Sequence, residues 1–306
     1  MAGASIVIGI DGGATHATAV VCDTAGEELA RVAGGPGIIN PLDPTGCVGR
    51  LASLARSALA QAGLFAPADA MCCALAGAGR TDVSGAVRAE LMREYIARKV
   101  DIITDAEAAL ADAFGDAPGM LLIAGTGSVA WGRGEDGRVE RCGGWGTLLG
   151  DEGSGYALGL GALRASVQAA DGRVEPTALS SLVSEHAHAS DPEELIRWTA
   201  AASKAEVAAL APGVLALAAH DAVAAALRDE AAGALVQHVV VLYERLAPWH
   251  AAPMLALAGG LIREGGPLRS ALTAAVLDVL PDIRLHDRRV DAARGAARLA
   301  RAMQHA

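Results

Sequence analysis

The fold is decided by residues 120–156, which read MLLIAGTGSVAWGRGEDGRVERCGGWGTLLGDEGSGY. An apolar run stops at the glycine- and hydroxyl-rich stretch 125–128, and apolar residues resume at Val129. This pattern is typical of two strands joined by a tight turn. Glycines in such a turn let backbone N–H groups approach a ligand closely, and turns of this kind form anion-binding concavities.

Two further glycine-rich segments follow within the same stretch, GGWG at 143–146 and GDEGSG at 150–155. They surround one tryptophan, Trp145, and two carboxylates, Asp151 and Glu152. So much glycine weakens a packed element and favours a backbone shaped around a ligand. The stretch therefore predicts an active site.

The beginning of the chain repeats this layout. A β-branched run at 5–10 ends in DGGATH at 11–16, a second apolar strand is expected at 17–22, and a third at 28–33 after an acidic turn. The two layouts lie about 110 residues apart, which indicates an internal duplication. Two similar α/β lobes would place two glycine turns facing each other across a cleft.

A carboxylate stands at the end of another expected strand. The spacing predicts a helix from Asp82 or Ser84 to Lys99, then a strand at 100–104 that is followed directly by Asp105. Chemistry in α/β folds is placed at the carboxyl ends of strands, so Asp105 is a candidate catalytic group. After residue 156 the chain is expected to be mostly helical, with one long helix over 214–246.

Composition excludes several classes of protein. A chain of 306 residues can hold two domains, and its net charge of −10 argues against a nucleic-acid partner. The alanine-rich stretch 207–219 is too short, and too broken by Pro212 and Gly213, to cross a membrane. The five cysteines show no CxxC spacing, and the first ten residues show no signal-peptide pattern, so we expect a cytoplasmic protein with reduced thiols.

Taken in order, the motifs DGGATH, ITDA, LLIAGTGS, GGWG, GDEGSGY and LAGGL resemble the BadF/BadG/BcrA/BcrD-type ATPase branch of the sugar kinase, Hsp70 and actin superfamily. Within that branch they are most similar to N-acetylglucosamine kinases, over nearly the whole chain. The resemblance implies an α/β fold in which two ribonuclease-H-like (actin-like ATPase) lobes flank a nucleotide cleft. The expected lobes are 1–115 with 290–306, and 116–289 with a helical insertion.

The resemblance also implies a role for each matching residue. Asp105 matches the catalytic aspartate, and Asp11 matches the aspartate that holds Mg²⁺ through water. The residues that match the two loops for the ATP phosphates are Gly12, Gly13, Thr15, Thr126 and Gly127. Those that match the turn near the adenosine are Gly259 and Gly260. Those that match sugar-contacting positions are Asn40, Gly144, Trp145 and Asp151.

Some of these matches have an alternative interpretation. Asp105 could instead cap the helix expected to begin at Ala106, which is a common use of aspartate. Trp145 fits ordinary core packing as well as a sugar contact. Asp151 and Glu152 are adjacent, so in an extended stretch only one of them can face the sugar, and we choose Asp151.

One position departs from the pattern. Animal N-acetylglucosamine kinase follows GTGS with an asparagine that touches the sugar, whereas this chain has Val129. Recognition of the N-acetyl group is therefore the weakest part of the resemblance. Cys72 and Cys73 lie in an apolar strand, where burial is expected, and His16 is expected to be a turn or surface residue.

The resemblance implies an ATP-dependent amino-sugar kinase that uses Mg²⁺ and phosphorylates, in the first instance, the 6-hydroxyl of N-acetylglucosamine. Glucosamine and N-acetylmuramate are alternative substrates. The expected partner is a small amino sugar, with no nucleic acid and no membrane, and the expected assembly is a homodimer. A rival within the same branch is an ATPase that activates a partner reductase or dehydratase. Such activators hold an iron–sulfur cluster with cysteines, for which this chain offers no suitably placed pair.

Overall fold

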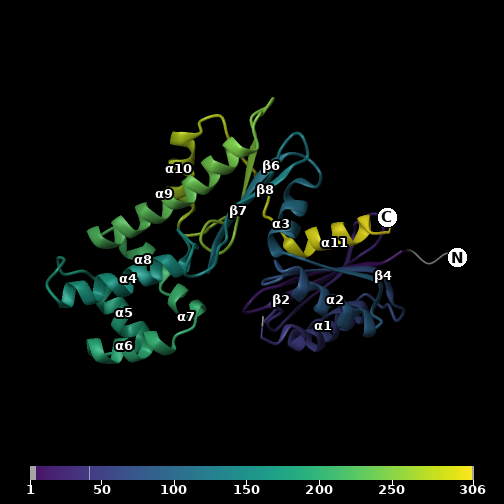
Figure 1. The fold of residues 1–306 in the computed structure, drawn as a ribbon, viewed down its shortest axis with the longest axis horizontal. Coiled ribbons are helices and arrows are strands. Elements are labelled where there is room, and N and C mark those ends of the chain that lie inside the picture. Colours follow the sequence, from purple (N-terminus) through teal and green to yellow (C-terminus); the bar gives the residue numbers. More distant parts are fainter. Residues whose placement is uncertain (1–4, 41, 305–306) are drawn as a thin grey trace. The chain divides into compact units, whose positions relative to one another are not determined.

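The computed structural model describes residues 5–40 and 42–304. Contacts divide the chain into two compact units, Met1–Asp116 with Val290–Ala306, and Ala117–Arg289. Each unit contains its own five-stranded sheet (Figure 1). The expected α/β fold with two lobes is confirmed.

The first unit has the strand order β3-β2-β1-β4-β5. The strands are β1 (Val7–Gly12), β2 (Ala17–Cys22), β3 (Glu28–Gly34), β4 (Ala68–Leu75) and β5 (Ala97–Ile103). β1, β2 and β3 are antiparallel neighbours, whereas β4 and β5 run parallel to β1. The carboxyl ends of β1, β4 and β5 therefore share one edge of the sheet, which is where Asp11 and Asp105 lie.

Helices cover both faces of this sheet. The elements α1 (Val48–Gln61) and α2 (Thr81–Arg93), with the short 3-10 helix η1 (Pro44–Cys47), pack on one face, and α3 (Asp105–Phe114) and α11 (Ala292–Ala302) pack on the other (Figure 1). α11 can approach the sheet closely because Gly9 has no Cβ. A Cβ there would lie 2.2 Å from the Ala293 carbonyl oxygen. Small residues at such contacts explain how an alanine-rich chain packs its core.

The expected helix ending at Lys99 is wrong at both ends. α2 begins at Thr81 after Arg80, with no side-chain cap from Asp82 or Ser84, and it ends at Arg93. Tyr95 then adopts a left-handed conformation, with φ of 55°, which turns the chain out of the helix. β5 consequently starts at Ala97, three residues earlier than the expected strand.

The second unit repeats the strand order of the first, as β10-β9-β6-β7-β8. Its strands are β6 (Gly119–Ala124), β7 (Ser128–Arg133), β8 (Val139–Gly143), β9 (Met254–Ala258) and β10 (Arg284–Leu285). β6, β7 and β8 are antiparallel neighbours, and β9 and β10 are parallel to β6. The glycine stretch 125–128 forms the turn between β6 and β7, as predicted.

Helices make up the rest of the second unit. They are α4 (Gly155–Ala170), α5 (Leu179–Ala187), α6 (Pro192–Ala201), α7 (Lys204–Ala208), α8 (Ala211–Leu217), α9 (Ala222–Arg245) and α10 (Arg269–Val279). The single helix expected over 214–246 is wrong, because the chain bends between α8 and α9, where the Asp221 side chain accepts a hydrogen bond from Ala224 N and caps α9.

No single helix in the described part of the chain is long and apolar enough to cross a membrane. One pair of segments, Lys204–Leu217 and Ala222–Arg245, passes the length and composition test only when taken together, and it is bent by 114°.

Candidate active site

Three carboxylates gather at one edge of the first sheet. Asp11 is the second-last residue of β1, Asp105 follows β5, and Asp291 caps α11. The pKa of Asp11 is raised from 3.8 to about 6, first because the carboxylate is partly buried, and then because Asp105 and Asp291 add negative charge while His16 opposes the rise. This edge of the sheet is therefore suited to bind a cation.

Asp105 is not the cap of its helix. Thr104 is the N-cap of α3: its side chain accepts a hydrogen bond from Glu107 N at 3.2 Å, and Glu107 Oε2 accepts one from Thr104 N at 2.8 Å. The alternative interpretation of Asp105 as the cap is thus wrong. Its carboxylate is exposed, and Oδ1 accepts a hydrogen bond from Ala106 N at 2.9 Å.

The surroundings of Asp105 suit a group that takes up a proton. Although solvent reaches the side chain, protein around the carboxylate limits its hydration, and this desolvation raises its pKa above 3.8. The hydrogen bond from Ala106 N opposes the rise. A carboxylate with a raised pKa is a stronger base toward a hydroxyl than an ordinary aspartate.

The first glycine turn is fixed by backbone contacts. Gly13 N donates to His16 O at 2.9 Å, and Gly13 O accepts from Gly37 N at 3.0 Å. A Cβ at Gly12 would lie 2.6 Å from a methyl group of Leu75 and 3.1 Å from Gly37 Cα, so a larger residue would force Leu75 to move and would press on the Gly37 backbone. Thr15 is exposed at the tip of the turn.

The segment after this turn, which includes Asn40, lies beside the carboxyl end of β4. Ile39 N donates to Ala76 O at 3.0 Å, just after β4. The Asn40 side chain is exposed, and its Oδ1 accepts a hydrogen bond from Leu42 N at 3.0 Å. Its amide nitrogen can donate to a ligand.

The residues near Asp11 suit a Mg²⁺ ion that binds together with the nucleotide. No group of three or more His, Cys, Asp or Glu side chains with metal-site geometry occurs among the described residues. Mg²⁺ in phosphoryl-transfer sites needs only one or two carboxylates, because phosphates and waters supply its other ligands. The raised pKa of Asp11 reflects first its partial burial and then the negative charge of Asp105 and Asp291, and a nearby cation would favour the ionised form.

The second glycine turn is held by the segment that follows GGWG. Ser128 is 3% exposed; its N donates to Asp151 Oδ1 at 3.1 Å, and its Oγ donates to Glu152 O at 2.6 Å. Gly155 N, at the start of α4, donates to Gly125 O at 2.8 Å. Thr126 stays exposed at the tip of the turn. The turn is therefore rigid while its outer backbone stays accessible.

Gly259 and Gly260 lie against this second turn. They follow β9, which is parallel to β6, and Leu261 N donates to Ala124 O at 3.1 Å. Gly259 has φ of +90°, and a Cβ there would lie 2.3 Å from Ala124 O, so only glycine fits. The second unit thus brings the expected phosphate turn and the expected adenosine turn together.

The GGWG segment lies over the beginning of β7. Gly144 has φ of +72°, and a Cβ there would lie 2.7 Å from Val129 Cγ2. Trp145 is 65% exposed, and the Arg141 guanidinium lies 4.4 Å from its ring centroid. The interpretation of Trp145 as a core residue is therefore wrong, and its ring is available to a ligand.

Asp151 is more enclosed than the sequence suggested. It is 4% exposed and has φ of 63°, and its Oδ2 accepts a hydrogen bond from Lys204 Nζ at 2.5 Å. A carboxylate has about four acceptor positions, so the contacts with Ser128 and Lys204 leave capacity for a ligand. Glu152, by contrast, points to solvent, 3.6 Å from His238 Nε2.

Sequence reasoning missed Ser128, Lys204 and His238. His238 is 7% exposed, and a Cβ at Gly143 would lie 2.4 Å from its Nε2, so its ring supports the GGWG segment. These residues act through contacts between distant parts of the chain, which local patterns do not reveal. For Lys204 a signal existed, because the 25 lysines and arginines of the sequence include only two lysines, Lys99 and Lys204.

The expected behaviour of the remaining side chains is confirmed. Cys72 and Cys73 are buried, and burial raises the pKa of both thiols. Cys22 and Cys47 are also buried, whereas Cys142 is partly exposed. His16 is exposed. The described cysteines therefore offer no pair of accessible thiols for a shared cluster.

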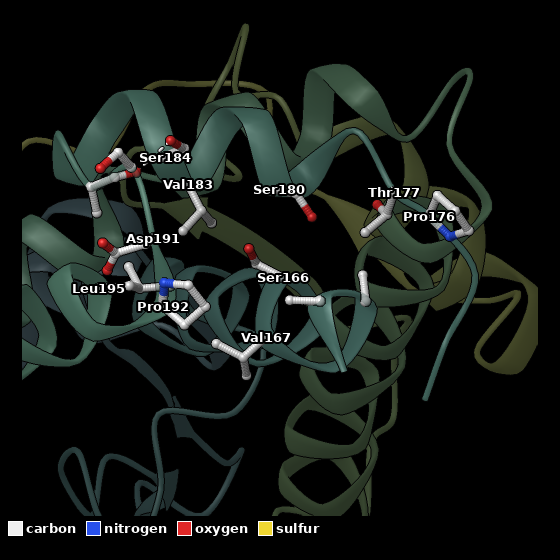
Figure 2. A pocket seen from close by; sticks show the side chains of 14 residues that line it. Ser166, Val167, Pro176, Thr177, Ser180, Val183, Ser184, Asp191, Pro192 and Leu195 are labelled. Atoms are coloured by element: carbon white, nitrogen blue, oxygen red, sulfur yellow. Dashed lines mark hydrogen bonds between the residues drawn. The ribbon is translucent and has the colours of Figure 1, made fainter. Parts of the chain in front are cut away.

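A separate cavity of about 390 Å³ lies in the helical part of the second unit. Figure 2 shows Ser166 of α4 and Ser180 of α5 pointing into it from facing helices, with Asp191 and Leu195 further along its wall. None of the expected site residues lines this cavity. It is thus distinct from the glycine turns described above.

Comparison with known proteins identifies the family of the chain. Residues 8–300 match the model of the BadF/BadG/BcrA/BcrD ATPase family, and the chain belongs to that family.

Individual relatives cover nearly the whole chain. An N-acetylmuramic acid/N-acetylglucosamine kinase from Clostridium acetobutylicum is 31% identical over 299 residues, 96% of this chain and 98% of the relative. An N-acetyl-D-glucosamine kinase from Dictyostelium discoideum is 29% identical over 320 residues, 96% of this chain and 97% of the relative. The crystal structure of a proposed N-acetylglucosamine kinase from Chromobacterium violaceum superposes with a TM-score of 0.82 at 28% identity, covering 97% of this chain and 99% of that one.

Proposed function

We propose that this protein is an ATP-dependent amino-sugar kinase that phosphorylates the 6-hydroxyl of N-acetylglucosamine. The observation that carries the proposal is Asp105, an exposed carboxylate with a raised pKa that lies just beyond the end of a parallel strand and whose charge helps to raise the pKa of Asp11. The family and the named activities of the relatives above agree with this chemistry.

Each group of residues has a role in the transfer. Backbone N–H groups of the two glycine turns, with the hydroxyls of Thr15 and Thr126, bind the phosphates. Mg²⁺, held near Asp11, supplies charge neutralisation for the phosphates when it is bound. Asp105 orients the sugar hydroxyl and accepts its proton as the oxygen attacks the γ-phosphorus. Phosphoryl transfer depends mainly on positioning and electrostatics, which these rigid turns provide.

Three side chains are the proposed contacts for the sugar. Trp145 offers an exposed ring face, the Asn40 amide can donate, and Asp151 retains acceptor positions for adjacent hydroxyls. Hydrogen bonds to a charged group contribute about 1.5–3 kcal/mol each, which is large for a small neutral ligand. The homodimer and the cytoplasmic location expected from the sequence stay predictions.

The experiment that tests the function is a sugar panel with Mg²⁺·ATP and detection of ADP. N-Acetylglucosamine, glucosamine, N-acetylmuramate and glucose distinguish the amino-sugar kinases from one another and from a hexokinase. 6-Deoxy-N-acetylglucosamine tests the position of transfer, because it lacks the proposed acceptor. ADP formation with the 6-deoxy sugar equal to that with N-acetylglucosamine would contradict transfer to the 6-hydroxyl.

The 2-substituent of the sugar is expected to be read loosely. Val129 is half-buried against Gly144 and supplies no polar group there. Apolar contacts discriminate by only ~1–3 kcal/mol per methylene, so N-acetylglucosamine should be preferred over glucosamine by about 10–200-fold in kcat/KM. The matched variant Val129→Asn adds an amide and should increase this preference. A preference above about a thousandfold in the unmodified protein exceeds what a valine can supply and would mean that another residue reads the group.

A further inference from the structure

Lys204 forms an ion pair with the buried Asp151 beside the second glycine turn. Its Nζ donates to Asp151 Oδ2 at 2.5 Å, and the side chains of Lys204 and Asp151 are 35% and 6% exposed. The other oxygen of Asp151 accepts from Ser128 N, the last residue of the turn. The pair therefore joins α7, in the helical part of the second unit, to the turn between β6 and β7.

Neither the position in the helix nor the composition of the chain explains a lysine at residue 204. Lys204 is the first residue of α7, directly after the capping residue Ser203. The positive end of the helix dipole disfavours a cation there. Lysine is also rare in this chain, where Lys99 is the other example among 25 basic residues. The contact with Asp151 offsets the unfavourable position of Lys204 at the start of its helix.

The charge of Lys204 matters because of where Asp151 lies. The Asp151 carboxylate contacts the backbone of the turn that carries Thr126 and Gly127. A negative charge there repels the phosphates of a nucleotide, and a buried carboxylate without a partner is itself costly. The ammonium group cancels that charge without removing the hydrogen bond from Asp151 to the turn.

The fit of the pair against the turn is tight. A Cβ at Gly127 would lie 2.4 Å from Asp151 Oδ1 and 3.1 Å from Lys204 Nζ. The compact ammonium of lysine fits this space, whereas the planar guanidinium of arginine needs more room. This size limit favours lysine over arginine at this position.

We propose that Lys204 is a positioning residue for the nucleotide: acting through Asp151, it fixes the second glycine turn and neutralises the carboxylate behind it. The inference rests on the ATP binding of the proposed function and adds a residue from the helical part, outside the glycine turns. Its role concerns nucleotide affinity rather than the sugar.

The test compares Lys204→Met, Lys204→Arg and the double variant Lys204→Met with Asp151→Asn, read by calorimetric binding of Mg²⁺ and a non-hydrolysable ATP analogue. Lys204→Met should weaken binding by about tenfold or more, because the Asp151 charge is left unpaired beside the turn. Lys204→Met with Asp151→Asn removes both charges and should restore affinity to within about threefold of the unmodified protein, since the pair acts as a unit. Lys204→Arg should fall between these two.

Controls separate this role from a structural one. Lys99→Met removes the other lysine, which bonds the Met303 carbonyl on the first unit, and should leave nucleotide affinity unchanged. If Lys204→Met does not fold, the double variant alone decides, because it leaves no unpaired charge. Failure of the double variant to recover affinity, or normal affinity of Lys204→Met, overturns the inference.

The measurement needs no sugar, so it is independent of substrate identity. A protein that binds the analogue but phosphorylates no amino sugar contradicts the proposed function and leaves this inference standing. A protein that binds no nucleotide at all contradicts both.

Discussion

Asp105→Asn is expected to lower kcat by ~10²–10⁴-fold, the usual contribution of a general base. The substitution keeps the size and the hydrogen bond from Ala106 N, since the amide oxygen can still accept it. It removes only the ability to take up a proton. Binding of nucleotide and of sugar should therefore change little, and single-turnover kinetics with Mg²⁺·ATP and N-acetylglucosamine measure the chemical step.

Thr104→Ala is the matched control, because Thr104 rather than Asp105 caps α3. Loss of this cap should cost about 0.5–2 kcal/mol of stability, with little loss of kcat. Near-normal turnover of Asp105→Asn would show that Asp105 has no part in proton transfer. The raised pKa of Asp105 adds a second check: the acid limb of the kcat profile should lie above 3.8, because the carboxylate must be ionised to act.

The sequence was sufficient where a local pattern carries the structure. The turn at 125–128 was predictable because an apolar run, a glycine-hydroxyl stretch and a second apolar run specify two strands and their connection. The repeat of that pattern near Asp11 predicted the second lobe, and both sheets have the same strand order. Glycine positions such as Gly259 were also informative, because only glycine adopts its backbone conformation.

The sequence was insufficient where the role of a residue depends on the exact position at which a helix begins. Thr104 and Asp105 are both good caps, and the choice between them depends on where the first helical turn begins, which a pattern leaves uncertain by one or two residues. The break between α8 and α9 was missed for a related reason, since alanine-rich segments favour helix on both sides of it.

Contacts between distant residues were beyond prediction from one sequence. Lys204 and Asp151 are 53 residues apart, and no periodicity connects them. Their pairing depends on how α7 packs against α4 and on the left-handed conformation of Asp151, both of which are tertiary features. The sequence therefore identified Asp151 but not the lysine that determines its charge environment.

Asp11→Asn is expected to reduce activity and to stabilise the ligand-free protein. Asp11 matches a residue that holds Mg²⁺ through water, and losing such an outer contact typically costs 10–100-fold in metal affinity or activity. The Mg²⁺ concentration needed for half-maximal activity should rise accordingly. A Mg²⁺ titration at saturating ATP measures this effect, and an unchanged Mg²⁺ dependence would refute the metal role.

The stability effect follows from the pKa. In the folded protein the pKa of Asp11 is about 6, compared with an ordinary value of 3.8, chiefly because of partial burial and then the charge of Asp105. Folding therefore disfavours the ionised form: the protein loses stability as the pH rises through the window from about 4 to about 6, and the loss is complete above it. A shift of about two units corresponds to about 3 kcal/mol, which partial solvent exposure reduces to about 1–2 kcal/mol.

Asn carries no charge, so Asp11→Asn should be more stable than the unmodified protein by about 1–2 kcal/mol at pH 7.5, with no gain below pH 4. Denaturant unfolding without nucleotide or Mg²⁺ at the two pH values measures the difference. Asp82→Asn is the control with the opposite sign, because the Arg80 side chain lowers the pKa of Asp82, so this substitution should not stabilise at pH 7.5. Equal stability of Asp11→Asn and the unmodified protein at pH 7.5 would mean that neither burial nor the neighbouring carboxylates disfavour the ionised form of Asp11 in the folded protein. Asp11→Asn is thus expected to lower activity and to raise stability. This combination is expected of a site that holds a cation, because its charges are unfavourable until the cation binds.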